Sequence, residues 1–116
     1  GKDNCLINQA VAGAVTDAVY LSDAGVLVGC TAGKSVLAYG LDGRQRWVRY
    51  CRSGVVRLLE RPEGVLAVAE DGELTLFSAE GGILEKWDAG RPVSQVLETG
   101  EETFLLSGQE LWRLEL

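Results

Sequence analysis

The sequence LDGRQRW at residues 41–47 places a tight turn directly before a strand that carries a tryptophan, and the pattern returns as AEGGILEKW at residues 79–87. Other residues repeat with a constant spacing of 39 positions, in that Gly25, Gly33, Leu37 and Gly43 are followed by Gly64, Gly72, Leu76 and Gly82. A repeat of about forty residues made of short segments is typical of proteins whose units stack on one another. The sequence therefore predicts a repeat architecture.

Short apolar runs separated by turns fill the chain, and no window shows the helical period. Asp42-Gly43 is a hairpin-type dipeptide, because both residues tolerate the positive φ that a tight β-turn needs. We predict strands at residues 15–22, 26–31, 35–40 and 44–51, then at 55–61, 65–69, 73–78 and 83–88, and then at 93–98, 103–107 and 111–116. The expected fold is all-β, with about twelve strands in three antiparallel sheets.

The strands fall into units that resemble β-propeller blades. We expect one propeller segment over residues 1–116, with a closing outer strand in 1–13 (Asn4 to Ala10), a first blade at 14–52, a second at 53–91, and a third at 92–116 that lacks its last strand. Propellers close with about four to eight blades, so three blades make a half-propeller or a propeller fragment. Such a chain either self-associates into a larger ring or belongs to a longer propeller. The start at Gly1 without an initiating methionine is expected of a chain trimmed at its start or of a segment taken from something longer.

The segment at 41–47 resembles the tryptophan-bearing blade motif of PQQ-like (quinoprotein-type) repeats, and the second copy has one extra residue before Trp87. The resemblance implies that Trp47 and Trp87 are structural and pack between blades. The WD40 class is the alternative, but the chain has no histidine for a Gly-His signature, and its Trp87-Asp88 pair falls on a fourth predicted strand. Trp112 matches neither motif, and we expect it to serve packing.

Most catalytic chemistry is excluded by composition. Without histidine there is no Ser-His-Asp or Cys-His arrangement. The segment at 33–35, Gly-Lys-Ser, resembles the end of a phosphate-binding loop, but Val28 stands where the first glycine should be and the segment lies between two strands rather than before a helix. We interpret it as a hairpin turn. The acidic pairs at 70–71 and 101–102 fall in turns and are expected to be solvated caps rather than paired catalytic acids.

Metal and cofactor sites are not predicted either. Cys5, Cys30 and Cys51 are widely separated and show no C-x-x-C spacing, so we interpret them as small buried apolar side chains rather than zinc ligands or a disulfide framework. Free thiols favour a reducing, cytoplasmic compartment. No vicinal cysteine pair is present, so the PQQ-like resemblance does not extend to a quinone cofactor or to dehydrogenase activity.

The net charge of −6 is unevenly distributed. Residues 1–52 contain six Lys/Arg against four Asp, whereas residues 53–116 contain five Lys/Arg against thirteen Asp/Glu. This asymmetry either prevents aggregation of strand edges or favours head-to-tail pairing of units. Arginines cluster at 44–52, but the acidic chain argues against nucleic acid as a partner. No apolar run approaches the length of about 18 residues that spans a bilayer, so no membrane partner is predicted.

Two functions remain after these exclusions. The first is a non-catalytic protein-interaction or scaffold module, whose loops at one end present Lys34, Arg52, Asp71 and Arg91 to a protein partner or to a second copy in a six-bladed homodimeric ring. The alternative is a lectin-like or small-ligand-binding propeller whose pocket forms on oligomerisation, or a fragment of a larger propeller enzyme. The oligomeric state and the presence of a polar pocket on the axis would discriminate between them, because the fold alone does not.

Overall fold

A computed structural model describes residues 14–116, which form eleven strands and no helix. The strands are β1 (Val15–Leu21), β2 (Val26–Thr31), β3 (Ser35–Gly40), β4 (Gln45–Tyr50), β5 (Val55–Arg61), β6 (Gly64–Ala69), β7 (Glu73–Ser78), β8 (Ile83–Asp88), β9 (Gln95–Glu98), β10 (Thr103–Ser107) and β11 (Glu110–Arg113). The all-β prediction is confirmed. The closing strand predicted at Asn4 to Ala10 lies outside the described residues.

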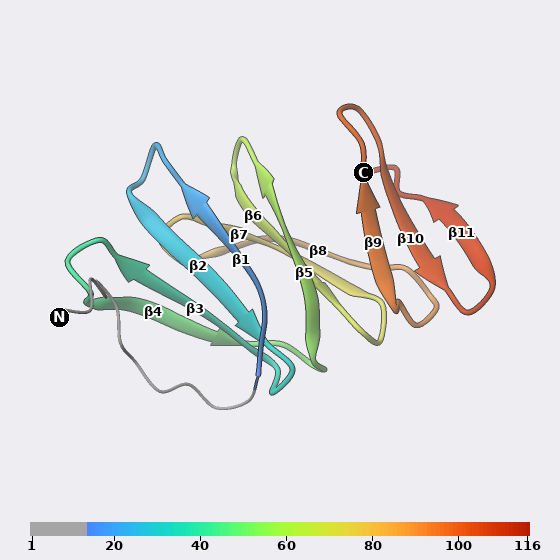
Figure 1. Ribbon diagram of the computed structural model, residues 1–116, viewed down its shortest axis with the longest axis horizontal. Coiled ribbons are helices and arrows are strands. Elements are labelled where there is room, and N and C mark those ends of the chain that lie inside the picture. Colours follow the sequence, from blue (N-terminus) through green and yellow to red (C-terminus); the bar gives the residue numbers. More distant parts are fainter. Residues whose placement is uncertain (1–13) are drawn as a thin grey trace, which may run out of the picture.

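The strands form three antiparallel sheets, which we call blade 1 (β1–β4), blade 2 (β5–β8) and blade 3 (β9–β11). Within each sheet the strands follow one another in chain order, and the first strands β1, β5 and β9 lie side by side along one edge of the stack. Figure 1 shows the three sheets arranged as an open row, with the largest extent 46 Å. The arrangement is that of propeller blades in an open arc rather than a closed ring.

Blades 1 and 2 share their irregularities as well as their strand order. The pairing register shifts between Val15 and Asp17 in β1 and at the matching place between Val55 and Arg57 in β5. A second shift follows Ala38 in β3, and its counterpart follows Leu76 in β7. Because a bulge re-aims side chains and bends a strand, two shared bulges indicate that the two blades are built on one plan.

Two apolar clusters join the blades. The first cluster lies between blades 1 and 2 and includes Val28, Val36 and Trp47 from blade 1 with Leu58 and Phe77 from blade 2. The second lies between blades 2 and 3, where Leu59, Leu66 and Leu74 of blade 2 meet Val93 and Leu105 of blade 3. We call the face of a blade that points toward the next blade in the chain its forward face, and the opposite face its back face; only blade 2 packs with both faces among residues 14–116. Both faces of blade 2 are covered, which explains why β6 is buried at every residue.

Trp47 joins blade 1 to the outer hairpin of blade 2. Its side chain is only 7% exposed, and its indole Nε1 donates a hydrogen bond to the carbonyl oxygen of Ala79 at 2.9 Å. Its ring lies 5.9 Å from that of Phe77, centroid to centroid. Gly81 adopts φ +88°, and a Cβ at this position would come within 2.7 Å of the indole Cδ2. The turn of blade 2 therefore needs glycine both for its backbone conformation and for the space that Trp47 occupies.

The two tryptophans do not occupy equivalent positions, and the sequence alignment of the two motifs was wrong by one residue in the turn. The positive-φ turn residues are Gly43 and Gly81, whereas the sequence aligned Gly43 with Gly82. Trp47 pairs with Ala38 just before the bulge, and the residue at this place in blade 2 is Glu85, which pairs with Leu76.

Trp87 lies two residues further along its strand, at the position that Arg49 holds in blade 1. A shift of two residues keeps a side chain on the same face of a strand. Trp87 accordingly still points forward and packs against the second apolar cluster, but it is only partly buried. Blade 3 has three described strands, so no outer hairpin equivalent to residues 79–81 meets Trp87 among residues 14–116.

Replacing Trp47 and Trp87 with alanine should therefore have unequal effects. We expect Trp47→Ala to lower the free energy of unfolding by about 3–5 kcal/mol, because it empties a well-packed aromatic site and leaves the Ala79 carbonyl without its donor. Trp87→Ala should cost clearly less, because the side chain is partly exposed. Urea unfolding of both variants beside the wild type measures the difference. Equal losses would contradict the unequal roles assigned here.

The buried thiols give the protein a pH dependence at alkaline pH. Cys30 is buried and Cys51 is half-buried, and both are free, whereas Cys5 lies outside the described residues. Burial, with a further contribution from Glu73, raises the pKa of Cys51 to about 11. In an unfolded chain a cysteine loses its proton near pH 8.5, roughly. Between these two pH values the folded chain holds a proton that the unfolded chain has lost.

The free energy of unfolding should consequently fall as pH rises through this window, because the unfolded chain releases the Cys51 proton while the folded chain still holds it. Cys51→Ala should make the decline shallower between pH 9 and 11, roughly. Unfolding curves at several pH values, measured for both proteins, test this. Identical slopes would show that the Cys51 thiol titrates normally in the folded chain.

Candidate functional site

The four loop residues predicted to contact a partner lie at one end of the blades, and two of them, Arg52 and Asp71, are in direct contact. Arg52 follows β4, and its Nε lies 2.5 Å from Asp71 Oδ2 in the turn between β6 and β7. The same guanidinium lies 2.9 Å from Asp88 Oδ2 and 3.9 Å from Glu73 Oε2. The carbonyl of Arg91 packs closely against Gly72, next to Asp71. Arg52 thus joins blade 1 to the β6–β7 turn and to the end of β8, which lie at the same end of blade 2.

Hydrogen bonds and ion pairs lower the pKa of two of the acidic residues around Arg52. Hydrogen bonds from Arg52 and from the Gly90 amide lower the pKa of Asp88. Partial burial on its own would raise the pKa of Asp71, but the hydrogen bonds from Arg52 and from the Glu73 amide outweigh it, and the pKa of Asp71 is lowered. Three carboxylates face this single guanidinium, so the positive charge predicted for partner binding is compensated within the chain.

Arg91 and Lys34 occupy different surroundings at the same end. The Arg91 guanidinium lies 3.5 Å from the centroid of the Trp112 ring, and its Nη1 lies 4.0 Å from Glu110. Trp112 lies in β11 and its ring contacts the Arg91 guanidinium. It is 41% exposed, which is more than expected for the packing role predicted from the sequence. Lys34 is exposed and adopts φ +77° in the turn before β3, at the position that Gly72 holds before β7. The role of these four residues in partner binding stays a prediction.

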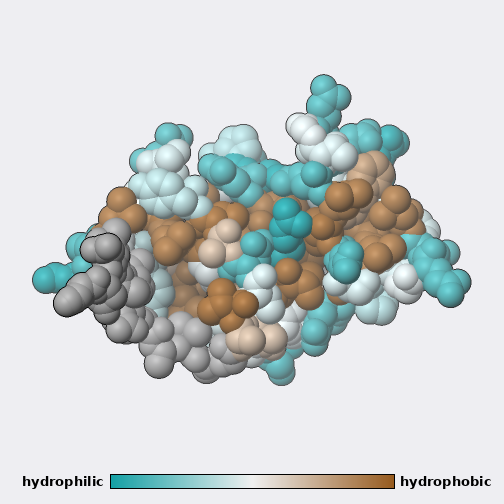
Figure 2. Space-filling model, viewed as in Figure 1, coloured by the Kyte–Doolittle hydropathy of each residue, from teal (hydrophilic) through white to brown (hydrophobic). Residues whose placement is uncertain are grey.

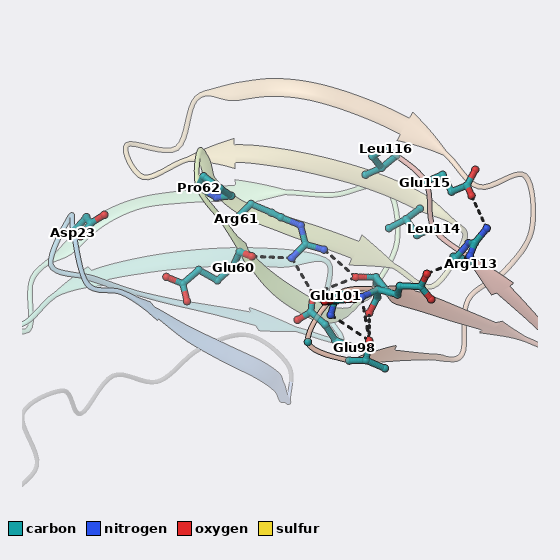
Figure 3. Close-up of a pocket in the computed structure, with 14 residues that line it drawn as sticks. Asp23, Glu60, Arg61, Pro62, Glu98, Glu101, Arg113, Leu114, Glu115 and Leu116 are labelled. Carbon is teal, nitrogen blue, oxygen red and sulfur yellow. Dashed lines mark hydrogen bonds and ion pairs between the residues drawn. The ribbon is translucent and has the colours of Figure 1, made fainter.

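The sequence did not reveal a groove of about 860 Å³ at the opposite end. The turns that follow β1, β5 and β9 point the same way, along the upper edge in Figure 1. The groove is formed by these turns and the C-terminal segment, and it is lined by Asp23, Glu60, Arg61, Pro62, Glu98, Thr99, Gly100, Glu101, Glu102, Thr103, Arg113, Leu114, Glu115 and Leu116. Figure 3 shows the charged members projecting from blades 2 and 3, with Asp23 of blade 1 on the far side.

The groove is acidic. Its lining contains six carboxylates and two guanidiniums. Arg61 lies 2.9 Å from Glu98 Oε2 and donates to Thr103 Oγ1 at 3.1 Å, which fastens the β5–β6 turn to blade 3. Arg113 lies 3.2 Å from Glu102 and 3.1 Å from Glu115.

Three acidic residues of the groove remain available to a ligand. Asp23, Glu60 and Glu101 have no ion-pair partner among residues 14–116, and all three side chains are exposed. Figure 2 shows hydrophilic residues along the same edge of the molecule. The free carboxylates give the groove a negative potential that attracts cationic groups.

The acidic turn at Glu101-Glu102 was interpreted from sequence as a solvated cap. Both residues are exposed, and Glu102 also pairs with Arg113. What it missed is that turns from three different blades bring such residues together. The excess of acidic residues in 53–116 was the available signal, but the strand register needed to place them at one end was not known.

Other site classes have no counterpart in the described part of the chain. Residues 14–116 contain no group of three or more potential metal ligands in binding proximity. Over the same range, no helix has the length and hydrophobicity required to span a bilayer.

Comparison with known proteins shows the fold. No family model matches the sequence, and no curated protein matches it in sequence. Among solved structures, Sqt1 of Saccharomyces cerevisiae is similar with a TM-score of 0.71 and 14% identity, covering 86% of this chain and 31% of that one. BBS1N, in its complex with ARL6DN, has a TM-score of 0.69 and 14% identity, covering 89% of this chain and 34% of that one.

A computationally designed protein, Ika4, has a TM-score of 0.69 and 12% identity, covering 97% of this chain and 99% of that one. Sqt1 and BBS1N are β-propellers, so the propeller-type fold predicted from the sequence repeat is confirmed. The chain spans about a third of the length of these two proteins. It therefore has the architecture of a β-propeller segment.

The contacts around Arg52 predict a specific change in carboxylate ionisation. Arg52→Gln should raise the pKa of Asp71 and Asp88 toward the usual range, because both lose their charged hydrogen-bond donor. The pKa of Asp42 is also lowered, chiefly by the Arg44 amide, and should not change in the variant. NMR titration of the side-chain carboxyl carbons measures all three residues in one experiment. Unchanged pKa values of Asp71 and Asp88 in the variant would show that Arg52 does not lower them.

Proposed function

We propose that the chain is a non-catalytic protein-interaction module built of propeller blades, and that the acidic groove binds a basic polypeptide segment. The observation that carries this proposal is the position of the groove. It is assembled from turns of all three blades, so the fold itself fixes its charged side chains relative to one another. Loops held on a rigid scaffold are the usual place for binding residues in proteins.

The character of the groove supports a polypeptide over a small apolar ligand. Small-molecule sites are mostly enclosed and lined by hydrophobic and aromatic side chains. This groove has no aromatic residue in its lining, and its apolar contribution comes from Pro62, Leu114 and Leu116. Lysine and arginine side chains of a flexible segment match such a surface in both charge and reach. The lectin-like alternative finds less support in this lining.

The proposal of a non-catalytic role rests on side-chain chemistry. The chain has no histidine. Within the groove, Glu98 accepts hydrogen bonds from Arg61 and Thr103, and Glu102 pairs with Arg113. Both carboxylates are therefore engaged in contacts within the chain. A binding role uses the same negative charge directly.

We assign the blades to the PQQ-like class rather than the WD40 class. The support comes from Trp47, which lies on the outer strand of blade 1 and packs against the next blade, as the resemblance in sequence implies. The similar structure of BBS1N was solved in complex with ARL6DN, so one propeller of this general shape takes a protein partner. Because one fold carries many functions, we use this as an analogy only. We also propose that a second copy of the chain is a partner, forming a six-bladed ring.

Charge reversal in the groove tests the binding proposal. The probe is a fluorescent lysine-rich peptide, titrated with the full chain at low and high salt. We expect Glu60→Lys combined with Glu101→Lys to weaken binding at least about tenfold, which corresponds to about 1.4 kcal/mol. These two residues have no ion-pair partner within residues 14–116, so the fold should be retained.

The matched control is Glu80→Lys combined with Glu85→Lys, which makes the same change in net charge on exposed residues of blade 2 outside the groove. It should alter the affinity little. If both double variants weaken binding equally, the attraction comes from the net charge of the chain and the groove has no special role. Binding that is unaffected by either pair would also contradict the proposal.

A further inference from the structure

The contacts between blades follow a directional rule. Blade 1 uses its forward face to pack against the back face of blade 2, and blade 2 packs against blade 3 in the same direction. Along the inner edge, Thr16 Oγ1 of β1 donates to the Val55 carbonyl at 2.6 Å, and Arg57 Nη1 of β5 donates to the Val96 carbonyl at 2.9 Å. The chain therefore contains two examples of one head-to-tail contact.

This rule leaves the forward face of blade 3 without a partner among residues 14–116. Strand pairing places Leu97 opposite Phe104, and Leu106 opposite Leu111. Their neighbours Val96 and Leu105 pack toward blade 2, so alternation directs these four apolar side chains to the other face. Leu97 is 57% exposed and Leu111 is 59% exposed. Figure 2 shows apolar residues gathered over this sheet.

The back face of blade 1 carries the matching surface. Leu27 pairs with Tyr39 in blade 1 just as Val65 pairs with Phe77 in blade 2, where both residues pack against the preceding blade. Tyr20 is 43% exposed on the same face as Leu27. Tyr39 holds the position in blade 1 that Phe77 holds in blade 2, and its side chain is only 9% exposed. Blade 1 is shaped like a blade that follows another one.

The net charges of the blades favour a second copy of the chain as the occupant, although Arg52 of blade 1 is already paired with carboxylates of blade 2. Residues 14–52 contain five Lys/Arg against three Asp, a net charge of +2, whereas residues 92–116 contain one Arg against five Glu, a net charge of −4. Blade 2, at residues 53–91, has four Lys/Arg against eight Asp/Glu, so the blade that already packs on blade 1 is equally acidic. If blade 3 of a second copy packed on the other side of blade 1, the basic blade 1 would have an acidic blade on each side.

We propose that the forward face of blade 3 docks on the back face of blade 1 of a second copy, and that two such contacts close a ring of six blades. The inference rests on the proposed interaction function and names one partner. A head-to-tail contact closes only when the rotation per copy completes a circle, and two copies related by a two-fold axis along the ring satisfy this condition. Six blades lie within the range of about four to eight in which propellers close.

The first measurement is the mass of the full chain in solution by light scattering. At about 50 µM we expect twice the 12.5 kDa of one chain, with dissociation at lower concentration or higher salt. A monomer at this concentration overturns the proposal. A trimer or larger assembly overturns the six-bladed ring.

Two variants locate the contact, each with its fold checked by circular dichroism. Leu97→Glu places a charge on the forward face of blade 3, and Tyr20→Glu places one on the back face of blade 1. Each should raise the dissociation constant of the dimer at least about tenfold. Leu41→Glu is the control, because Leu41 is 54% exposed in the β3–β4 turn and lies away from both faces. The proposal is overturned if both face variants still dimerise like the wild type. It is also overturned if only the control variant loses the dimer.

Mixing the two face variants gives the sharpest result. In a head-to-tail ring, the mixed pair has one contact with both defects and one contact with none, so mixing should restore part of the dimer. In a symmetric contact between two blade 3 faces, Tyr20→Glu would dimerise normally and mixing would restore nothing. That outcome overturns the docking mode. A monomeric chain that still binds the lysine-rich peptide would refute the ring and leave the groove proposal standing.

Discussion

The structure depends on how one blade is fastened to the next, and Trp47 is the clearest instance. A large aromatic ring is buried between two sheets while its single polar atom is satisfied by a backbone carbonyl of the next blade. Arg49, two residues further along, donates to the Gly81 carbonyl at 2.8 Å, so two side chains of β4 grip the same hairpin. Burial of the ring provides most of the stabilisation, and the hydrogen bonds fix the orientation of the blades.

The same contact cannot be repeated at the next blade. Trp87 is displaced by two residues relative to Trp47, and blade 3 has no fourth strand among the described residues to form an outer hairpin. Trp87 therefore packs against the second apolar cluster with part of its surface exposed. The three blades are equivalent in topology but unequal in how well each is covered. Blade 2 has both faces buried, whereas Leu97 and Leu111 are exposed on the forward face of blade 3.

Electrostatics differ between the two ends of the blades. At one end, Arg52 is surrounded by carboxylates and Arg91 rests on Trp112, so the charges serve contacts within the chain. At the other end, the groove has more carboxylates than guanidiniums and three of its acidic residues are unpaired among residues 14–116. Exposed ion pairs contribute little to stability, so the first end mainly fixes the relative positions of turns. At the second end, the unpaired carboxylates of the groove leave a negative charge that a cationic partner can contact.

The sequence by itself determined the all-β class, the division into blade-like units and the position of nearly every strand. Alternating apolar residues and Gly-containing turns are local signals, and they set strand limits without reference to the rest of the chain. Val26–Thr31, Ser35–Gly40 and Ile83–Asp88 match the prediction at both ends. The loops carrying Arg52 and Asp71 were also placed at a common end from sequence, because they follow strands of the same direction.

Only the tertiary structure decided which residues occupy equivalent positions in blades 1 and 2, and which turns of different blades come together. Trp47 and Trp87 are not equivalent, because the positive-φ glycine of the second turn is Gly81 and the strand that follows is paired accordingly. The two short motifs alone do not specify this strand register. The acidic groove likewise depends on three turns, about forty residues apart in sequence, that stacking brings to one edge. Contacts between distant segments arise from the packing of whole sheets, and that information is distributed over the chain rather than contained in any single motif.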